Sequence, residues 1–454
     1  MSEILVGVLG FLTIIAIVTT LFKSKTLPSI AFIVFPSILA LILVAIGYYS
    51  FDNIGDLIKA GFNSTGKTAA LFVFSVLYFG IMTDAGMFDV VIGKLMKMVG
   101  GNVVGVALMT CIIALIGHLD GGGASTFCIV IPAMLPIYKK MHMRPTSLLQ
   151  ISVLAMGVLN LMPWAGPTMR AASVLGMEAG ALWGTIIPIQ IFGVVLAVVH
   201  AVIVGFIEKK RGAGLDGRLA QIEGDVVIEE TEAQAANELA RPKLFVFNII
   251  LTVAVIALLI WDRLPSYVPF MLGVAIAILV NYPGAKMQKK IINSHAGPAL
   301  MMCSTLMGAA VLMGILVKSV KVDGVAIPSV VTCMSDLIKM GLPAALGRHL
   351  PLVIGILSVP LALAFDTDSY FYGMLPVMIG IGEGFGIEAL PIAIAMVVCR
   401  NCATFISPMV PATLLGVGLA DVDIKDHIKN SFLWVWGFST LCLVFAILIG
   451  IMPL

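Results

Sequence analysis

The chain has 454 residues, of which 60% are apolar and only 11% are charged. Soluble proteins usually carry about 25% charged residues, and a chain this apolar would expose large hydrophobic surfaces to water, so a soluble globular fold is excluded. The net charge of +2 does not indicate a nucleic-acid partner. The seven cysteines are an odd number and lie mostly in apolar runs, so they predict no disulfide framework.

Ten apolar stretches reach or approach the length of about 20 residues that a helix needs to cross a bilayer. They are residues 4–22, 28–47, 68–84, 145–175, 182–207, 243–261, 265–282, 297–317, 386–416 and 430–451. No basic segment precedes the first stretch, which predicts a retained span rather than a cleaved signal. Prolines within 145–175 and 386–416 predict that both of these helices break, near residues 160–168 and 400–413.

Two further apolar regions, 102–139 and 346–382, carry polar residues at their centres. Each region is either a full crossing or a re-entrant hairpin that returns to the side from which it entered. If both are hairpins and the N-terminus lies outside, eighteen of the 27 Lys and Arg residues fall inside and seven outside, while Arg170 and Arg400 stay within the helix breaks. If both cross, the best division is fourteen to eleven. Because basic residues concentrate on the inner side of membranes, the hairpin interpretation is favoured.

The order of segments then repeats along the chain, and the odd number of crossings in each half turns the second half upside down. The expected fold is an all-α polytopic membrane protein with two inverted repeats of five transmembrane helices, each with a re-entrant hairpin and a broken helix. The expected parts are a first repeat at 1–207, a charged cytoplasmic linker at 208–242 and a second repeat at 243–454. Both termini are expected outside the plasma (inner) membrane. This architecture is typical of secondary transporters.

Polar residues gather at the two hairpin tips and the two helix breaks, which the inverted arrangement would bring together near the membrane midplane. A charge at that depth costs about 2.5–3.5 kcal/mol, so such a cluster indicates a functional site. Glycine backbones and helix N-termini there are suited to bind anions. The predicted substrate-binding residues are Gly121, Gly122, Gly123, Ser125, Thr126, Asn160, Gly166, Pro167, Thr168, Arg170, Ser369, Arg400, Asn401, Ser407, Pro408 and Thr413. The predicted proton- or metal-coupling residues are Asp120, Asp366 and Asp368, with Asp120 as the candidate metal ligand.

Structural roles stay open for several of these residues. Asn160 and Asn401 are alternatively the groups that satisfy their own helix breaks. Arg170 and Arg400 are alternatively partners of an aspartate that never meet the substrate. Asp368 is alternatively a cap for the second arm of its hairpin.

Two other features receive no functional role. Residues 61–68 read Gly-Phe-Asn-Ser-Thr-Gly-Lys-Thr and match the Walker A pattern, but a phosphate-binding loop follows a β-strand in an α/β domain. Here the segment is expected to link two membrane helices, so nucleotide binding is not predicted. His118, beside the first tip, is expected to be structural rather than a proton carrier.

Several motifs occur together at the tips and breaks. They are Leu-Asp-Gly-Gly-Gly-Ala-Ser-Thr at 119–126, Asn-Leu-Met-Pro-Trp-Ala-Gly-Pro-Thr at 160–168, Phe-Asp-Thr-Asp-Ser-Tyr at 365–370 and Ser-Pro-Met-Val-Pro-Ala-Thr at 407–413. This combination resembles the CitMHS family, the citrate–metal:proton symporters of the ion transporter superfamily. The resemblance implies proton-driven symport of citrate or a related tricarboxylate as a complex with Mg, Ca or a similar divalent metal. It also implies no permanently bound cofactor, a scaffold with an elevator-like moving subdomain, and a homodimer in the lipid bilayer.

One position departs from the pattern expected of that family. The first tip is expected to read Asp-Gly-Asp-Gly, and Gly122 stands where the second acid would be. Hard cations depend on oxygen ligands, so the loss of a carboxylate should weaken or alter metal ligation.

Other functions remain as rivals to proton-coupled symport. A sodium-coupled carboxylate symporter or a cation/proton antiporter would use the same scaffold, and a channel would conduct without accumulating its substrate. An intramembrane enzyme is disfavoured, because the sequence has no His-Glu-x-x-His or Gly-x-Ser-x-Gly motif.

Overall fold

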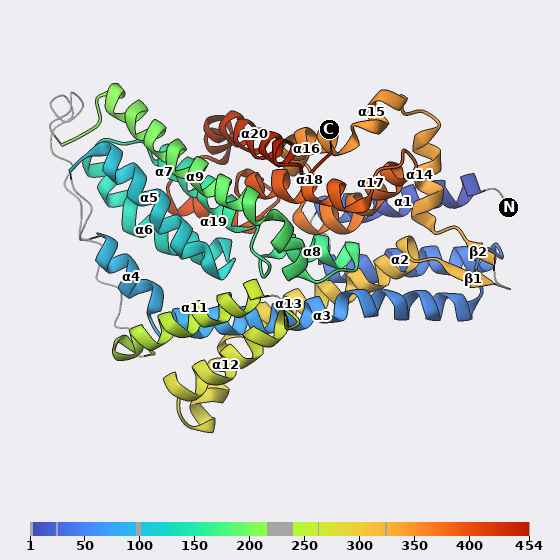
Figure 1. Ribbon diagram of the computed structural model, residues 1–454, viewed down its shortest axis with the longest axis horizontal. Coiled ribbons are helices and arrows are strands. Elements are labelled where there is room, and N and C mark those ends of the chain that lie inside the picture. Colours follow the sequence, from blue (N-terminus) through green and yellow to red (C-terminus); the bar gives the residue numbers. More distant parts are fainter. Residues whose placement is uncertain are drawn as a thin grey trace.

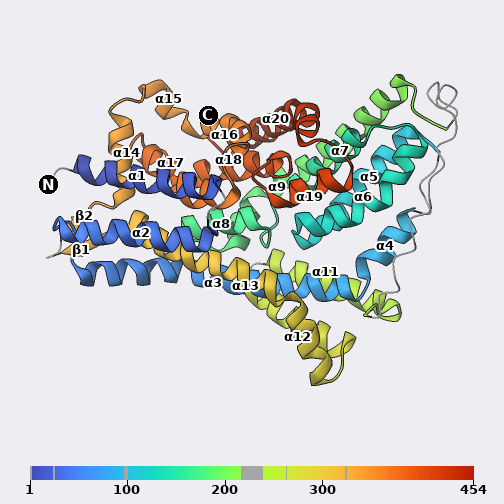
Figure 2. The same cartoon turned by 180° about the vertical axis from the view of Figure 1, so that it is seen from behind.

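The computed structural model describes residues 3–23, 26–96, 101–215, 239–261, 263–322 and 325–453. Within these ranges, eight helical segments are long and apolar enough to span a membrane. They are α1 (Glu3–Phe22), α2 (Pro28–Ala45), α3 (Phe51–Asp84), α5 with its terminal 3-10 turn (Val103–Asp120), α9 (Ala179–Arg211), α11 with the turn before it (Pro242–Trp261), α13 (Ala285–Val317) and α20 (Ile424–Leu448). The chain is a multi-span membrane protein that is helical almost throughout (Figures 1 and 2).

The two stretches expected to break are each divided into two shorter helices. The first forms α7 (Pro145–Leu159) and α8 (Gly166–Leu175), and the second forms α18 (Ala389–Cys402) and α19 (Pro411–Leu419). Prolines stand in the first turn of α8 and of α19, where a missing N–H removes no intrahelical hydrogen bond. The prolines therefore begin new helices instead of kinking continuous ones.

Residues 103–140 form a helical hairpin. The first arm is α5 (Val103–Gly117), the second is α6 (Gly123–Lys140), and the 3-10 turn His118–Asp120 leads into the tip between them. Both ends of the hairpin meet the segment that follows α9. The Met141 carbonyl accepts a hydrogen bond from the Gly214 N–H at 2.9 Å, and a Cβ added to Gly101 would lie 3.1 Å from Leu215.

A second hairpin follows in the other half of the chain. It consists of α15 (Ala344–Arg348), α16 (Leu350–Ala362), a π-helical turn (Ser369–Met374) and α17 (Leu375–Glu383). Its ends also lie together, since a Cβ added to Gly347 would lie 2.5 Å from the Phe385 ring. Single π-turns are rare and frequently mark functional sites.

Each hairpin packs against the broken helix of the other half. In the first hairpin, α6 lies along α19 (Figures 1 and 2). A Cβ added to Gly123 would lie 2.3 Å from the Phe405 ring beside the second break. The π-helical turn of the second hairpin contacts α8. The two halves are therefore interlocked at the four places where their helices are interrupted.

The helices α3 and α13 pack together along much of their length, and glycines let their backbones approach. A Cβ added to Gly61 would lie 1.9 Å from the Ala310 carbonyl oxygen, and one added to Gly314 would lie 2.5 Å from that of Leu57. Small residues at such contacts are typical of membrane helices. Because α3 is continuous, residues 61–68 lie inside a helix, and the expectation of a link between two helices was wrong.

The remaining elements are short or peripheral. A β-hairpin of β1 (Val320–Val322) and β2 (Val325–Ile327) pairs Val320 with Ile327, which the all-α expectation did not include. The other elements are α4 (Met87–Met96), α12 (Tyr267–Asn281), α14 (Val330–Lys339) and the 3-10 turns Pro242–Leu244 and Thr404–Ile406. Most of the expected linker, at 216–238, lies outside the described residues.

The close α3–α13 contact predicts opposite effects of alanine at the two glycines of the Walker A-like segment. Gly61→Ala forces a methyl group into the α13 backbone and is expected to destabilise the protein by about 1–3 kcal/mol. Gly66→Ala meets nothing within 4 Å and should be neutral or slightly stabilising, because alanine favours helices. Thermal unfolding in detergent measures both, and equal midpoints for the two variants would contradict the packing.

Candidate functional site

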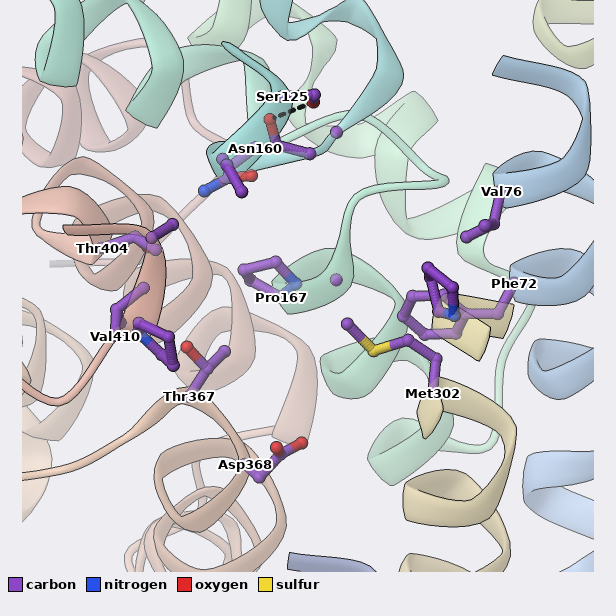
Figure 3. Close-up of a pocket in the computed structure, with 18 of the residues that line it drawn as sticks. Phe72, Val76, Ser125, Asn160, Pro167, Met302, Thr367, Asp368, Thr404 and Val410 are labelled. Carbon is purple, nitrogen blue, oxygen red and sulfur yellow. Dashed lines mark hydrogen bonds between the residues drawn. The ribbon is translucent and has the colours of Figure 1, made fainter. Parts of the chain in front are cut away.

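The two hairpin tips and the two helix breaks line one side of a cavity of about 1230 Å³. Residues of α3, α13 and the segment leading into α2 form the opposite side. Figure 3 shows side chains from the tips and breaks facing side chains of α3 and α13 across this space: Asn160, Pro167, Thr367, Asp368, Thr404 and Val410 on one side, and Phe72, Val76 and Met302 on the other. The cavity is large enough for a small-molecule ligand.

The carboxylate of Asp120 is held within the first hairpin tip. One oxygen accepts the Gly122 N–H at 2.7 Å, and the other accepts the Ser125 hydroxyl. The turn requires a left-handed residue at Gly121, which has a φ of 71° and lies close to the backbone of Ala165 in the first break. Asp120 therefore orders the tip and also lines the cavity.

Asp366 plays the same part in the second tip. One of its oxygens accepts the N–H groups of Asp368 and Ser369 at 2.8 and 3.0 Å, and the other accepts the Ser369 hydroxyl at 2.6 Å. This satisfies N–H groups that the start of the following helical turn leaves unpaired. The capping role that stayed open for Asp368 thus belongs to Asp366.

Asp368 instead pairs with Arg170 in the first break. The distance from Arg170 Nε to the Asp368 carboxylate is 2.5 Å, and the two side chains are 8% and 15% exposed. The guanidinium also lies 5.9 Å from the centre of the Phe72 ring on α3. A Cβ on Gly166 would lie 2.5 Å from Arg170 Nη1, so glycine at that position leaves room for the arginine.

Arg400 in the second break is fully buried, and no ion pair to it occurs among the described residues. It donates to the Phe365 carbonyl at 3.2 Å and to the Thr404 hydroxyl at 3.3 Å. Thr404 lines the cavity, so Arg400 lies directly behind its wall. Three buried side-chain atoms without a hydrogen-bond partner gather at this break: Arg400 Nε, Asn401 Oδ1 and Thr413 Oγ1. Such groups are uncommon in folded proteins and mark a place where polar ligands or rearrangement are expected.

The predicted site residues divide into those at the cavity and those behind it. Those that line the cavity are Asp120, Gly121, Gly122, Gly123, Ser125, Asn160, Gly166, Pro167, Arg170, Asp366, Asp368 and Pro408. Those that do not line it are Thr126, Thr168, Ser369, Arg400, Asn401, Ser407 and Thr413, all of which are buried. Several of the second group hold the breaks together: Thr168 donates to the Asn160 carbonyl at 3.0 Å and Ser407 to the Ala362 carbonyl at 2.5 Å.

Sequence reasoning missed the opposite wall of the cavity. Phe72, Phe79 and Met302 supply its apolar surface, and His295 on α13 pairs with Asp84 on α3 at 2.9 Å. The only hint in the sequence was that these titratable residues, Asp84 and His295, stand at or beside the ends of two apolar stretches. It does not reveal that α3 and α13 adjoin the tips.

No group of three or more His, Cys, Asp or Glu side chains within the described ranges is arranged to hold a metal ion. Asp120, the candidate metal ligand, has both carboxylate oxygens engaged in its own tip. Any metal at this site would therefore need ligands from a bound molecule.

The Arg170–Asp368 pair predicts strong coupling between these residues. Arg170→Met or Asp368→Leu alone leaves a buried charge unpaired and should destabilise the protein by about 3–5 kcal/mol, whereas the double variant should lose much less than the sum. A double-mutant cycle of unfolding free energies in detergent measures this. Lys59→Met, in an ion pair whose side chains are 77% and 67% exposed, is the control and should change stability by less than about 1 kcal/mol. Additive single effects would contradict an energetic coupling between the two side chains.

Comparison with known proteins identifies relatives along the whole chain. The family model CitMHS, described as citrate transporter, matches residues 4–399. A protein of Bacillus subtilis (strain 168) named "Citrate transporter" is 35% identical over 98% of this chain and 99% of its own length. Another from the same organism, named "Mg(2+)/citrate complex secondary transporter", is 32% identical over 98% of this chain and 99% of its own.

A solved structure shares the fold. The YdaH transporter of Alcanivorax borkumensis superposes with a TM-score of 0.63 and 13% sequence identity, covering 94% of this chain and 100% of the other. The family match and the two relatives confirm the resemblance found in the tips and breaks and the assignment to a transporter rather than an enzyme. The chain belongs to the CitMHS family of citrate transporters.

Proposed function

We propose that the protein is a secondary transporter that carries citrate, or a closely related tricarboxylate, as a complex with a divalent metal and together with protons. The names of two full-length relatives, a citrate transporter and an Mg²⁺/citrate transporter, support this substrate. The observation that carries the proposal is the cavity at the junction of both tips and both breaks, with charged and polar groups on its wall.

The charges of the cavity favour a metal complex over the free acid. Asp120, Asp366 and Asp368 line the cavity, against the guanidinium of Arg170. Fully ionised citrate carries three negative charges, of which a divalent cation cancels two, so the complex is repelled less by these carboxylates. The metal is then part of the substrate, held mainly by citrate oxygens.

The donors on the wall provide for the carboxylates of the substrate. Arg170 can offer its guanidinium and Asn160 its side-chain amide, while the start of α6 near Gly123 presents N–H groups. The predicted residues behind the wall support this surface. Arg400 contributes a positive charge through Thr404 without contacting the cavity in this conformation.

Proton coupling is assigned to the aspartates, with Asp368 at its centre. In this conformation the Asp368 carboxylate forms an ion pair with the guanidinium of Arg170. A proton on Asp368 would remove its negative charge and free Arg170 to bind a substrate carboxylate. Proton and anion would then bind together, as symport requires.

In this proposal the hairpins and breaks move as a unit against α3 and α13, which would open the cavity to one side of the membrane and then to the other. The hairpins would enter the membrane and return, as parts of two inverted repeats at 1–207 and 243–454. The charged linker at 208–242 would face the cytoplasm and both termini the outside of the plasma membrane. Two copies would associate as a homodimer through the scaffold helices.

Uptake of radiolabelled citrate into proteoliposomes tests the proposal. We expect accumulation under an inward proton gradient with Mg²⁺ or another divalent cation, and little with a chelator. Accumulation that needs a sodium gradient instead would identify a sodium-coupled carrier. Conductance that does not saturate with citrate concentration would identify a channel. Either the sodium dependence or such a conductance would overturn proton symport.

The coupling role can be tested separately with Asp368→Asn. This variant removes the carboxylate that pairs with Arg170, so citrate uptake should lose its dependence on the proton gradient. Asp336→Asn is the matched control, because Asp336 is half-exposed on α14 and pairs with Lys339 away from the cavity. If Asp368→Asn stays fully proton-driven, the coupling group lies elsewhere.

Arg400→Gln is expected to raise the KM for metal–citrate about tenfold or more, because it removes a buried positive charge directly behind the anion site. Arg348→Gln removes an exposed arginine at the far end of the second hairpin and serves as control. Uptake kinetics in proteoliposomes compare the two. Unchanged KM in Arg400→Gln would exclude an electrostatic role in binding.

A further inference from the structure

His118 links three parts of the site. Its ring is fully buried between the first tip, the first break and the second break. Nδ1 lies 2.7 Å from the Thr126 hydroxyl oxygen, and Nε2 lies 3.0 Å from the Asn160 side-chain oxygen. Phe405 packs edge-on against the ring at a centroid distance of 5.2 Å. The imidazole is therefore fixed in orientation, and both nitrogens have partners.

The protons of this network can be assigned from the groups that share them. A neutral imidazole carries one N–H, and the amide oxygen of Asn160 only accepts, so Nε2 must be the donor to it. Nδ1 then accepts the hydroxyl proton of Thr126. This leaves the Gly122 carbonyl satisfied, because it still accepts the Thr126 N–H at 3.1 Å. Both ring nitrogens, the Thr126 hydroxyl and the Asn160 side-chain oxygen are paired in this arrangement.

The arrangement determines what Asn160 presents to the cavity. Its side-chain oxygen is turned to His118, and its backbone oxygen accepts the Thr168 hydroxyl and the Asn401 amide, both at 3.0 Å. Its Nδ2 group makes no hydrogen bond to the described residues and is not sealed off from the cavity. The free end of the amide is then a pair of N–H donors.

We propose that His118 is a positioning residue that holds the Asn160 amide with its N–H groups toward the cavity, as donors for a substrate carboxylate. The inference rests on the proposed function, because an anionic substrate needs donors at this place. The reverse amide would place an oxygen in a cavity that three aspartates already line. That reverse arrangement requires the proton on Nδ1 of His118 and the Thr126 hydroxyl directed to the Gly122 carbonyl, 2.7 Å away.

Two substitutions of His118 separate its two hydrogen bonds. The amide nitrogen of glutamine reaches the place of Nε2, so His118→Gln keeps a donor for Asn160. Asparagine reaches only the place of Nδ1, so His118→Asn keeps the Thr126 contact and releases Asn160. We expect the KM for metal–citrate to rise about ten- to hundredfold in His118→Asn with a smaller change in maximal rate, and to rise much less in His118→Gln.

Threonine variants supply a matched control in the same hairpin. Thr126→Val removes the hydroxyl that keeps the proton off Nδ1, and the KM should rise as in His118→Asn. Thr110→Val removes a buried hydroxyl whose oxygen lies 3.0 Å from the Tyr138 hydroxyl oxygen. This hydrogen bond does not line the cavity, so the KM should stay unchanged. Equal KM values for His118→Gln and His118→Asn, or for Thr126→Val and Thr110→Val, would overturn the proposal.

The proton position can be read without any substrate. Nitrogen NMR of histidine-labelled protein distinguishes the two neutral tautomers, and the signal missing in His118→Gln assigns His118 among the six histidines. We expect a neutral ring protonated on Nε2, and a ring protonated on Nδ1 would overturn the proposal. If wild-type vesicles accumulate no citrate, the proposed transport function fails, while the tautomer still decides the orientation of Asn160.

Discussion

A helix that ends inside an apolar environment leaves backbone carbonyls and N–H groups that no water can satisfy. Four such interruptions occur among the described residues, and at three of them a backbone carbonyl accepts a hydrogen bond from a side chain at another interruption. The Asn160 carbonyl accepts the Asn401 amide of the opposite break. The Trp164 ring N–H donates to the Leu119 carbonyl at the first tip, and Arg400 donates to the Phe365 carbonyl at the second. Because these bonds cross between segments, the tips and breaks form one unit.

The same requirement explains the different roles of the acidic residues. Asp120 and Asp366 bind N–H groups in their own tips, so their charge is part of the backbone arrangement. The Asp368 carboxylate does not bind the N–H groups of its tip. It pairs instead with Arg170, almost two hundred residues earlier in the chain. Of the three aspartates, it is the one whose charge can change without dismantling a turn.

The two sides of the cavity are built in different ways. The wall of tips and breaks is polar and held by hydrogen bonds between segments, whereas α3 and α13 are joined through glycines that bring helix backbones into contact. Across the cavity, Arg170 meets this second wall through Phe72 and Met302 with soft contacts, an aromatic face at 5.9 Å and a sulfur at 3.9 Å. At Arg170 the two walls of the cavity therefore meet through weak contacts.

Composition and the spacing of polar residues determined by themselves that the chain enters a membrane, where its helices break and which residues resemble the citrate transporters. These are local properties, since apolar length sets the spans and prolines set the breaks. Only the tertiary structure decided that Asp366 caps while Asp368 pairs, that Arg400 lies behind the wall, and that α3 and α13 close the cavity. The sequence around Asp366 and Asp368 offers the same carboxylate twice, and partners on distant segments give the two acids different roles. Contacts between segments so far apart depend on how the whole chain packs, which no local pattern encodes.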